Sequence, residues 1–234
     1  MPCTETYKEH IMYTFHGFCK VVIRNAAKAI IDIGITDDIT LLDNDFLEIE
    51  NFARHLCGSD HLCLPTSKSE ALKLELLKHY PAMKCNSIDE NTWEYFLNRC
   101  TELNGFDLIL ICVGNTVIEK KVIQLLKEKQ IEKECIILWV EPYLVAGHAL
   151  VFQGEIDVST EKNIFDINGT FNNNVLVDSR KYLKSEAGCQ SAYAPYAGVE
   201  AQKFILDFLD IYYRKIYTKK EKHNYEFTWI GKMK

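Results

Sequence analysis

The chain contains few of the residues that interrupt regular structure, since 11 of its 234 residues are glycine and 5 are proline. This scarcity excludes collagen-like and low-complexity disordered proteins, and 47% hydrophobic with 26% charged residues is an ordinary globular composition. Basic residues are not in excess, because 27 Lys and Arg face 33 Asp and Glu. The resulting net charge of −6 argues against a general nucleic-acid-binding surface. No apolar run is long enough to predict a membrane-spanning helix.

Paired-cysteine motifs are also lacking, although the chain has nine cysteines. No two cysteines form a C-x-x-C pair, so the sequence predicts no four-thiolate zinc site. Their odd number and scattered positions favour free thiols, most of them acting as small buried hydrophobic residues. We therefore expect a reducing, cytoplasmic location.

Strand-like apolar runs alternate with amphipathic helical segments along most of the chain. The first helical pattern runs from Tyr7 to Ile33, and Gly34 is a plausible stop for it. The expected strands are Ile39 to Leu42, Phe106 to Val113, Ile136 to Val140 and Tyr225 to Ile230. The further expected helices are Ser67 to Tyr80, a helix through Trp93 to Leu97 that Asp89 can cap, Ile118 to Lys129 and Val199 to Tyr217.

This alternation predicts an α/β domain with a Rossmann-like, mostly parallel sheet and helices on both faces. We expect a single domain over residues 1–234, with an atypical helical N-terminal region at 1–38. Residues 154–196, which are rich in Asn, Asp and Ser, are expected to form a crossover or loop region with a strand around Val175 to Val177. Residues 197–234 would form a C-terminal helix and tail.

Asp43 is the first candidate functional residue, because it directly follows the strand predicted at Ile39 to Leu42. Ligands of doubly wound sheets bind beyond the carboxyl ends of the strands. A carboxylate there could accept hydrogen bonds from ribose hydroxyls. An aspartate at this point could equally cap a helix or a turn.

The sequence around Asp43 resembles a family motif. Ile39 to Arg54 reads ITLLDNDFLEIENFAR, and Lys68 opens the next predicted helix. This stretch is similar to the ThiF and ubiquitin-activating-enzyme pattern of a strand, D-x-D, a short spacer and N-x-x-R, followed by a lysine. Phe106 to Asn115 (FDLILICVGN) looks like the next nucleotide-side strand of that family.

Two further segments, WVEP at 139–142 and GHA at 147–149, resemble a pattern of bacterial relatives. Those relatives include the activating modules of anti-phage ubiquitin-like conjugation systems. The whole resemblance runs, with gaps, from about Ala26 to Leu209.

The resemblance implies a ThiF-like fold and an adenylyltransferase that uses ATP and Mg²⁺. Its substrate would be the C-terminus of a ubiquitin-like or sulfur-carrier protein. Asp43 would bind the ribose, Arg54 and Lys68 would contact phosphates, Asn51 would position the phosphates or order the loop, and Asn115 would lie on the nucleotide side. Alternatively, Arg54 and Lys68 are solvated surface cations. Such enzymes commonly act as homodimers or heterodimers, and a conjugating enzyme is a further expected partner.

Cys189 is the second candidate, since it lies beside a glycine in the polar sequence EAGCQ. In ubiquitin-activating relatives, a cysteine of the crossover region receives the activated C-terminus as a thioester. A thiol suits this step because its thiolate is nucleophilic and its acyl thioester stays reactive. Cys189 could instead be an ordinary semi-buried thiol. His148 could be a general base or a packed, hydrogen-bonded histidine.

The chain departs from the family pattern at two points. Residues 16–25 (HGFCKVVIRN) contain one glycine, no G-x-G and no clear preceding strand, where the family has a Gly-rich phosphate loop. Gly114 occupies the place where many relatives carry a Mg²⁺-binding aspartate. Two function classes therefore stay open: an active or split adenylyltransferase, and a catalytically inactive scaffold that binds an active partner subunit or a ubiquitin-like protein. The missing G-x-G-x-x-G counts equally against a Rossmann-type dinucleotide binder.

Overall fold

A computed structural model describes most of the chain. The described residues are 10–15, 20–46, 57, 66–153, 156, 163–167, 169–177, 179–182, 184–185, 192–193, 198–217 and 223–231.

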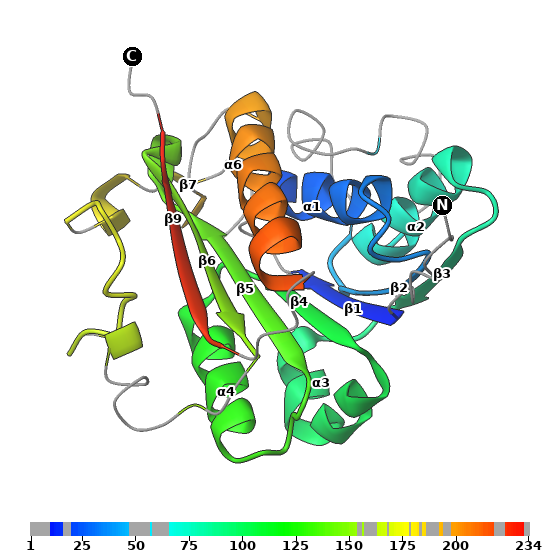
Figure 1. Cartoon of the computed structure of the whole chain (residues 1–234), viewed down its shortest axis with the longest axis horizontal. Helices are drawn as coiled ribbons and strands as arrows, with labels where there is room; N and C mark the ends of the chain where they lie inside the picture. Colours follow the sequence, from blue (N-terminus) through cyan, green and yellow to red (C-terminus); the bar gives the residue numbers. More distant parts are fainter. Residues whose placement is uncertain are drawn as a thin grey trace.

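A seven-stranded sheet forms the centre of the molecule, with the strand order β3-β2-β1-β4-β5-β6-β9 (Figure 1). The five strands from β3 to β5 are parallel, whereas β6 runs antiparallel to both β5 and β9. The predicted α/β class is confirmed; four of the six strand pairings are parallel, and the two pairings of β6 are antiparallel, so the sheet is mixed. The strands are β1 His10–Phe15, β2 Asp38–Leu42, β3 Lys84–Ile88, β4 Leu108–Cys112, β5 Glu134–Val140, β6 Ala146–Phe152 and β9 Tyr225–Ile230, and a separate antiparallel pair comprises β7 Lys184–Ser185 and β8 Ala192–Tyr193.

Helices cover both faces of the sheet, as the sequence predicts (Figure 1). The first face carries α1 Lys20–Asp32, α2 Lys68–His79 and α6 Gly198–Ile211, and the second carries α3 Thr92–Asn98 and α4 Thr116–Lys127. A π-helical turn, Tyr212–Tyr217, follows α6, and short 3₁₀ segments span Cys100–Gly105, Pro142–Leu144 and Ser179–Tyr182.

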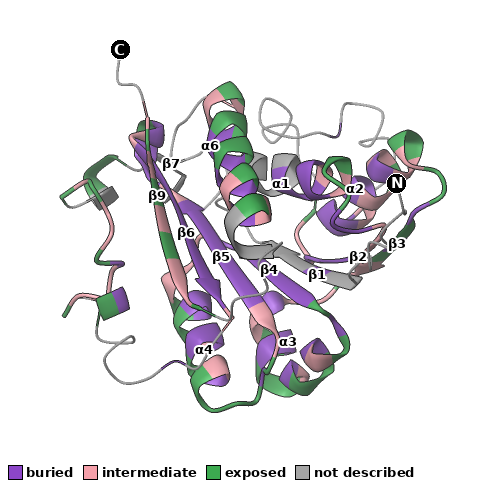
Figure 2. Cartoon of the chain, viewed as in Figure 1, coloured by how far each residue is buried: buried purple, intermediate pink, exposed green. Residues whose placement is uncertain are grey.

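The central strands are buried on both faces, which explains their continuous apolar sequences. In β4, Leu108 and Leu110 pack against the α1 and α6 side, while Ile109 and Ile111 pack against the α3 and α4 side. Figure 2 shows the same burial along β4 and β5. The core is therefore two apolar layers separated by the sheet.

The N-terminal region differs from the helical region predicted for residues 1–38. Residues 10–15 form β1, which pairs in parallel with β2 and with β4, and the helix begins only at Lys20. The sequence IMYTF within β1 is rich in β-branched and aromatic residues, and both neighbouring strands complete its hydrogen bonds. The prediction failed because a strand buried in the centre of a sheet has no alternating pattern and its apolar residues continue the helical spacing of α1.

The predicted helix stop at Gly34 is confirmed. Gly34 has φ +76°, and its amide donates to Ile31 O at 2.9 Å. The Ile35 amide donates to Ile30 O at 3.1 Å. These two bonds form a Schellman motif, in which a left-handed glycine satisfies the last carbonyls of a helix.

Besides β1, two further strands of the main sheet were not predicted, and one predicted strand is wrong. β3 is an edge strand with the polar sequence KCNSI, and β6 begins AGHA, so neither has a strong strand composition. β6 instead owes its conformation to pairing with β5 and β9. Val175 to Val177 form bends and a turn rather than a strand.

Gly147 provides a test of the packing between β6 and α6. A Cβ atom on Gly147 would lie 2.5 Å from Cγ of the buried Phe204 ring. We expect Gly147→Ala to lower the free energy of unfolding by about 1–3 kcal/mol, because the overpacked ring has to shift. Urea denaturation measures this change. Gly105→Ala is the matched control, since no atom lies within 4 Å of its Cβ position, and an equal loss in both variants would contradict the packing argument.

Candidate functional site

The strand order creates a ligand crevice at one edge of the sheet. β1 lies between β2 and β4, and the helices that follow β1 and β4 cover opposite faces. The connections therefore diverge beyond the carboxyl ends of β1 and β4, which is where open α/β sheets bind ligands. α1 begins at Lys20, and residues 16–19 lie outside the described part of the chain.

Asp43, Asp45 and Lys68 come together at the carboxyl end of β2. Asp43 is fully buried, and its Oδ1 accepts the Asp45 amide at 2.9 Å. Lys68 Nζ forms an ion pair with Asp45 Oδ2 at 2.6 Å, and the Lys68 amide donates to Asp45 O at 2.7 Å. Ser69 Oγ donates to Asp43 O at 2.9 Å. Lys68 therefore contacts the D-x-D motif directly through Asp45. This contact could not be read from the sequence, in which the two lie 23 residues apart.

The start of α2 fixes the position of Lys68. Ser67 caps this helix by accepting the Glu70 amide at 3.3 Å, and it forms a β-bridge with Phe46. Lys68 is 4% exposed, so it is not the solvated surface cation of the alternative interpretation. Asn51 and Arg54, the other two predicted residues of this motif, lie outside the described residues.

Asn115 lies at the carboxyl end of β4 and caps α4, since its Oδ1 accepts the Val117 amide at 3.0 Å. Gly114 precedes it with φ +60°. β1 separates β2 from β4, so about 10 Å lies between Asp43 and this turn in the plane of the sheet. Asn115 therefore lies at the same end of the sheet as Asp43, two strands away.

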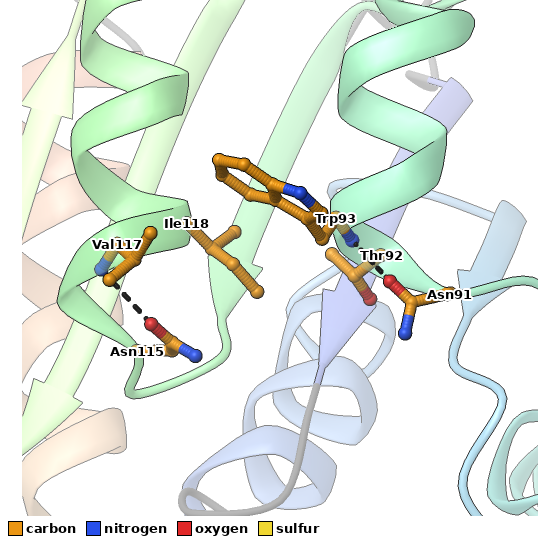
Figure 3. Close-up of a pocket in the computed structure, with 6 residues that line it drawn as sticks. All are labelled: Asn91, Thr92, Trp93, Asn115, Val117 and Ile118. Carbon is orange, nitrogen blue, oxygen red and sulfur yellow. Dashed lines mark hydrogen bonds between the residues drawn. The ribbon is translucent and has the colours of Figure 1, made fainter.

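A pocket of about 270 Å³ lies between the beginnings of α3 and α4 (Figure 3). Asn91 caps α3 by accepting the Trp93 amide at 3.0 Å, so the cap predicted at Asp89 is wrong. Sequence reasoning missed Asn91 and Trp93 as site residues, although an Asn two residues before Trp93 is a recognisable N-cap. The lining residues are Asn91, Thr92, Trp93, Asn115, Val117 and Ile118.

Glu119 was also missed, although it lies four residues after Asn115 and so on the same side of α4. It is 1% exposed, and burial raises its pKa to about 8 despite opposing hydrogen bonds from the amides of Asn115 and Gly114. Within the described part of the chain, no group donates a hydrogen bond to its Oε1. The sequence did contain a signal for this residue, because Glu119 is a glutamate in the first turn of an otherwise apolar helix face.

The described cysteines behave as the sequence predicts. Cys57, Cys85, Cys100, Cys112 and Cys135 are buried thiols, and none of these five is joined to another in a disulfide. Burial raises the pKa of Cys85 to about 12 and also raises that of Cys135, so these thiols stay protonated and unreactive at neutral pH. Cys189 lies outside the described residues, in the connection between β7 and β8.

His148 is a packed histidine. It lies within β6, is fully buried, and its Nε2 is 2.7 Å from Glu141 Oε1. Its ring stacks on Trp139 with centroids 4.8 Å apart. Of the two roles open from sequence, the structure therefore supports the hydrogen-bonded core residue.

Within the described ranges, no group of three or more His, Cys, Asp or Glu side chains could hold a metal ion. We therefore assign no protein ligand to the Mg²⁺ that the family resemblance implies. None of the described helices is long and apolar enough to cross a membrane.

Comparison with known proteins gives structural similarities only. No family model matches the sequence, and no curated protein matches it. The fold is similar to that of E. coli MccB, solved with ATP, with TM-score 0.48 and 19% identity over 64% of this chain and 42% of MccB. MccB solved with AMPCPP and MccA gives TM-score 0.47 and 19% identity over 62% and 40% of the two chains. The chain thus spans about two fifths of the length of MccB.

The raised pKa of Glu119 predicts an unusual pH dependence of stability. Between pH 4.5 and 8 the unfolded chain loses this proton while the folded chain keeps it, so the free energy of unfolding falls as pH rises. Glu119→Gln stays neutral throughout. We expect its stability relative to the wild type to grow from pH 5 to pH 8, reaching about 3 kcal/mol.

Guanidinium denaturation at pH 5, 6.5 and 8 measures this difference. Glu94→Gln, at an exposed position of α3, is the control and should show no such growth. A stability difference for Glu119→Gln that is the same at all three pH values would contradict the assignment of a neutral buried carboxyl.

Proposed function

We propose that this crevice binds ATP, and that the chain adenylates, or helps a partner adenylate, the C-terminal carboxylate of a ubiquitin-like or sulfur-carrier protein. The observation that carries the proposal is the cluster of Asp43, Asp45 and Lys68 at the carboxyl end of β2, in which Asp43 and Lys68 are buried. It joins both halves of the D-x-D…K motif at the edge of the sheet where α/β proteins bind ligands.

The pocket between α3 and α4 suits the base of the nucleotide. Its volume of about 270 Å³ is slightly below the roughly 300 Å³ lower limit of ligand pockets, so it holds a ring system rather than a whole nucleotide. Trp93 and Ile118 supply apolar and aromatic surface, and Asn91 and Asn115 supply polar groups (Figure 3). With the base there, the ribose would extend towards Asp43 and the phosphates towards α1 and Lys68.

Phosphate binding has two sources of positive charge in the described residues. The N-terminus of α1 follows β1 at the crevice, and helix N-termini provide amide donors for phosphates even without a G-x-G sequence. Lys68 is the second source, since Asp45 holds its ammonium group in place. Arg54 is proposed to add a forked contact to phosphate.

Adenylation joins two anions, which is why these cations are needed. A carboxylate oxygen of the carrier attacks the α-phosphorus of ATP, and the bond from that phosphorus to the bridging oxygen breaks and releases pyrophosphate. Positive groups near the α-phosphate stabilise the charge of the transition state. Cys189 is proposed to attack the acyl carbon of the adenylate next, forming a thioester and releasing AMP.

A non-catalytic scaffold remains the second candidate, favoured by Gly114 at the place of the metal-binding aspartate and by the lack of a G-x-G sequence. Such a scaffold would bind an active partner subunit or a ubiquitin-like protein. An assay of ATP–pyrophosphate exchange in the presence of a purified carrier protein distinguishes this scaffold from an active adenylyltransferase. ATP binding without exchange favours the scaffold, whereas exchange requires an active enzyme.

Removal of the Asp43 carboxylate tests the ribose site. We expect Asp43→Ala to weaken ATP binding at least tenfold, because two ribose hydroxyls lose their acceptor, and Asp43→Asn to weaken it less. Isothermal titration calorimetry with ATP measures the affinity, and circular dichroism checks the fold. Asp38→Ala, at the opposite end of β2, is the matched control. Equal affinity in Asp43→Ala and Asp38→Ala would overturn the ribose assignment.

Cys189 is tested by trapping the carrier adduct. We expect incubation with ATP, Mg²⁺ and a carrier protein to give an adduct that dithiothreitol cleaves and that Cys189→Ala does not form. Non-reducing gel electrophoresis and mass spectrometry detect it. Cys100→Ala is the control, because that thiol is buried at the far end of α3. An adduct that persists in Cys189→Ala would exclude the thioester role.

A further inference from the structure

The Glu141 carboxylate is the point where the crossover region attaches to the sheet. Glu141 directly follows β5 and is 2% exposed. Its Oε1 accepts the Val175 amide at 2.6 Å, and its Oε2 accepts the Leu176 amide at 2.7 Å. Burial alone would raise the pKa of this carboxyl, but hydrogen bonds from His148 and from these two amides outweigh it and lower the pKa.

His148 holds the carboxylate from the other side. It lies opposite Trp139 in the pairing of β5 with β6, and its Nε2 contacts Glu141 Oε1 at 2.7 Å. Its Nδ1 lies 3.2 Å from Thr228 Oγ1 on β9. His148 on β6 therefore contacts the Glu141 carboxylate directly, and Thr228 on β9 contacts His148.

A second attachment lies beside the first. Trp139 stacks on Phe171 with ring centroids 3.9 Å apart, and its Nε1 donates to Asn174 Oδ1 at 3.0 Å. The segment 171–176 is thus held both by its backbone, at Glu141, and by its side chains, at Trp139. The WVEP and GHA sequences supply Trp139, Glu141 and His148, and on β9 Glu226 Oε2 accepts a further hydrogen bond from Asn173 Nδ2 at 3.0 Å.

The turn that carries Glu141 is held by backbone hydrogen bonds to β6 and to the residue after β9. The Glu141 amide donates to Ala146 O at 3.0 Å, closing the hairpin between β5 and β6. Tyr143 and Leu144 have φ of +58° and +51°, a conformation that costs non-glycine residues free energy and persists only where the surroundings enforce it. The Gly231 amide donates to Val145 O at 2.9 Å and ties the turn to the end of β9.

The location of this attachment links it to the crevice. β5 neighbours β4 and is parallel to it, so Glu141 lies at the same sheet edge as Asp43 and Asn115. Downstream of the segment, the chain continues to β7 and to the connection that contains Cys189.

We propose that Glu141 is a positioning residue, which together with His148 holds the 171–176 segment at the crevice edge and so sets where the chain leading to Cys189 lies. This inference rests on the proposed function only for the role of Cys189; the attachment itself is independent of it. A carboxylate is required because both oxygens accept amide hydrogens. In Glu141→Gln, the NH₂ group would face an N–H donor and leave it without an acceptor.

The test compares Glu141→Gln with Glu134→Gln. Glu134 is a second carboxylate of β5 but lies at its amino end, where Gln153 Nε2 donates to it at 2.6 Å. Hydrogen exchange followed by mass spectrometry measures the Val175 and Leu176 amides. The labelling rate of Cys189 with N-ethylmaleimide, read from its own peptide, reports the position of the downstream chain. Calorimetry with ATP reports the nucleotide site.

For Glu141→Gln we expect exchange at Val175 and Leu176 to rise at least tenfold and Cys189 labelling to change at least threefold, with ATP affinity within twofold of the wild type. Glu134→Gln should lower the melting temperature and leave both the exchange and the labelling unchanged. Asn174→Ala removes only the hydrogen-bond acceptor of Trp139 Nε1 and should raise exchange at Val175 and Leu176 by a smaller factor. This variant provides a second test if Glu141→Gln fails to fold.

The proposal is overturned if Val175 and Leu176 stay protected in Glu141→Gln, or if Cys189 labels at the wild-type rate while they are exposed. It is also overturned if Glu134→Gln gives the same changes, because a general loss of stability would then explain them. Failure of the wild-type protein to bind ATP would refute the proposed function instead, and the exchange and labelling results would still decide the role of Glu141.

Discussion

The insertion of β1 between β2 and β4 is the interaction on which the rest of the structure depends. The backbone of β1 is hydrogen-bonded to both neighbours, so one strand joins the half of the sheet that carries Asp43 to the half that carries Asn115. The reversal of strand order at β1 also sends α1 and α4 to opposite faces and thereby opens the crevice. Without β1, the strand that carries the D-x-D motif and the strand that leads to the pocket between α3 and α4 would belong to two separate sheets.

Around this crevice, three acidic groups that are partly or fully buried are stabilised in three different ways. Asp45 is paired with the Lys68 ammonium group, and Glu141 is surrounded by donors from β6 and from the crossover segment. Glu119 has only two amides, and its pKa of about 8 shows that the neutral form is preferred. A buried carboxylate is tolerated only where donors offset its loss of hydration. The kind of donor beside each carboxyl group therefore indicates its role. Asp45 pairs with a cation, Glu141 holds the crossover segment, and Glu119 stays protonated.

The sequence alone predicts the elements with strong local signals. The strand at Ile39 to Leu42, the α2 helix capped by Ser67 and the stop at Gly34 depend on apolar runs, caps and glycine, which are readable locally. β1 and β6 were missed because pairing with neighbours far along the chain determines them. In the site, Asp43 and Lys68 were recognised by motif, whereas Trp93, Glu119 and the Glu141–His148 contact depend on which helices and strands become adjacent. Sequence patterns do not contain that information.

The central position of β1 also has a consequence for how the chain folds. Ile11 of β1 pairs with Ile39 of β2 on one side. On the other side it pairs with Leu108 of β4, which follows it in the sequence by about a hundred residues. During synthesis, the middle of the sheet therefore cannot close until β4 has left the ribosome, and β6 must wait in the same way for β9. Such distant pairings slow folding and expose unpaired strand edges in the meantime. Until β4 emerges, β1 has one unpaired edge, and such edges make folding intermediates prone to aggregation.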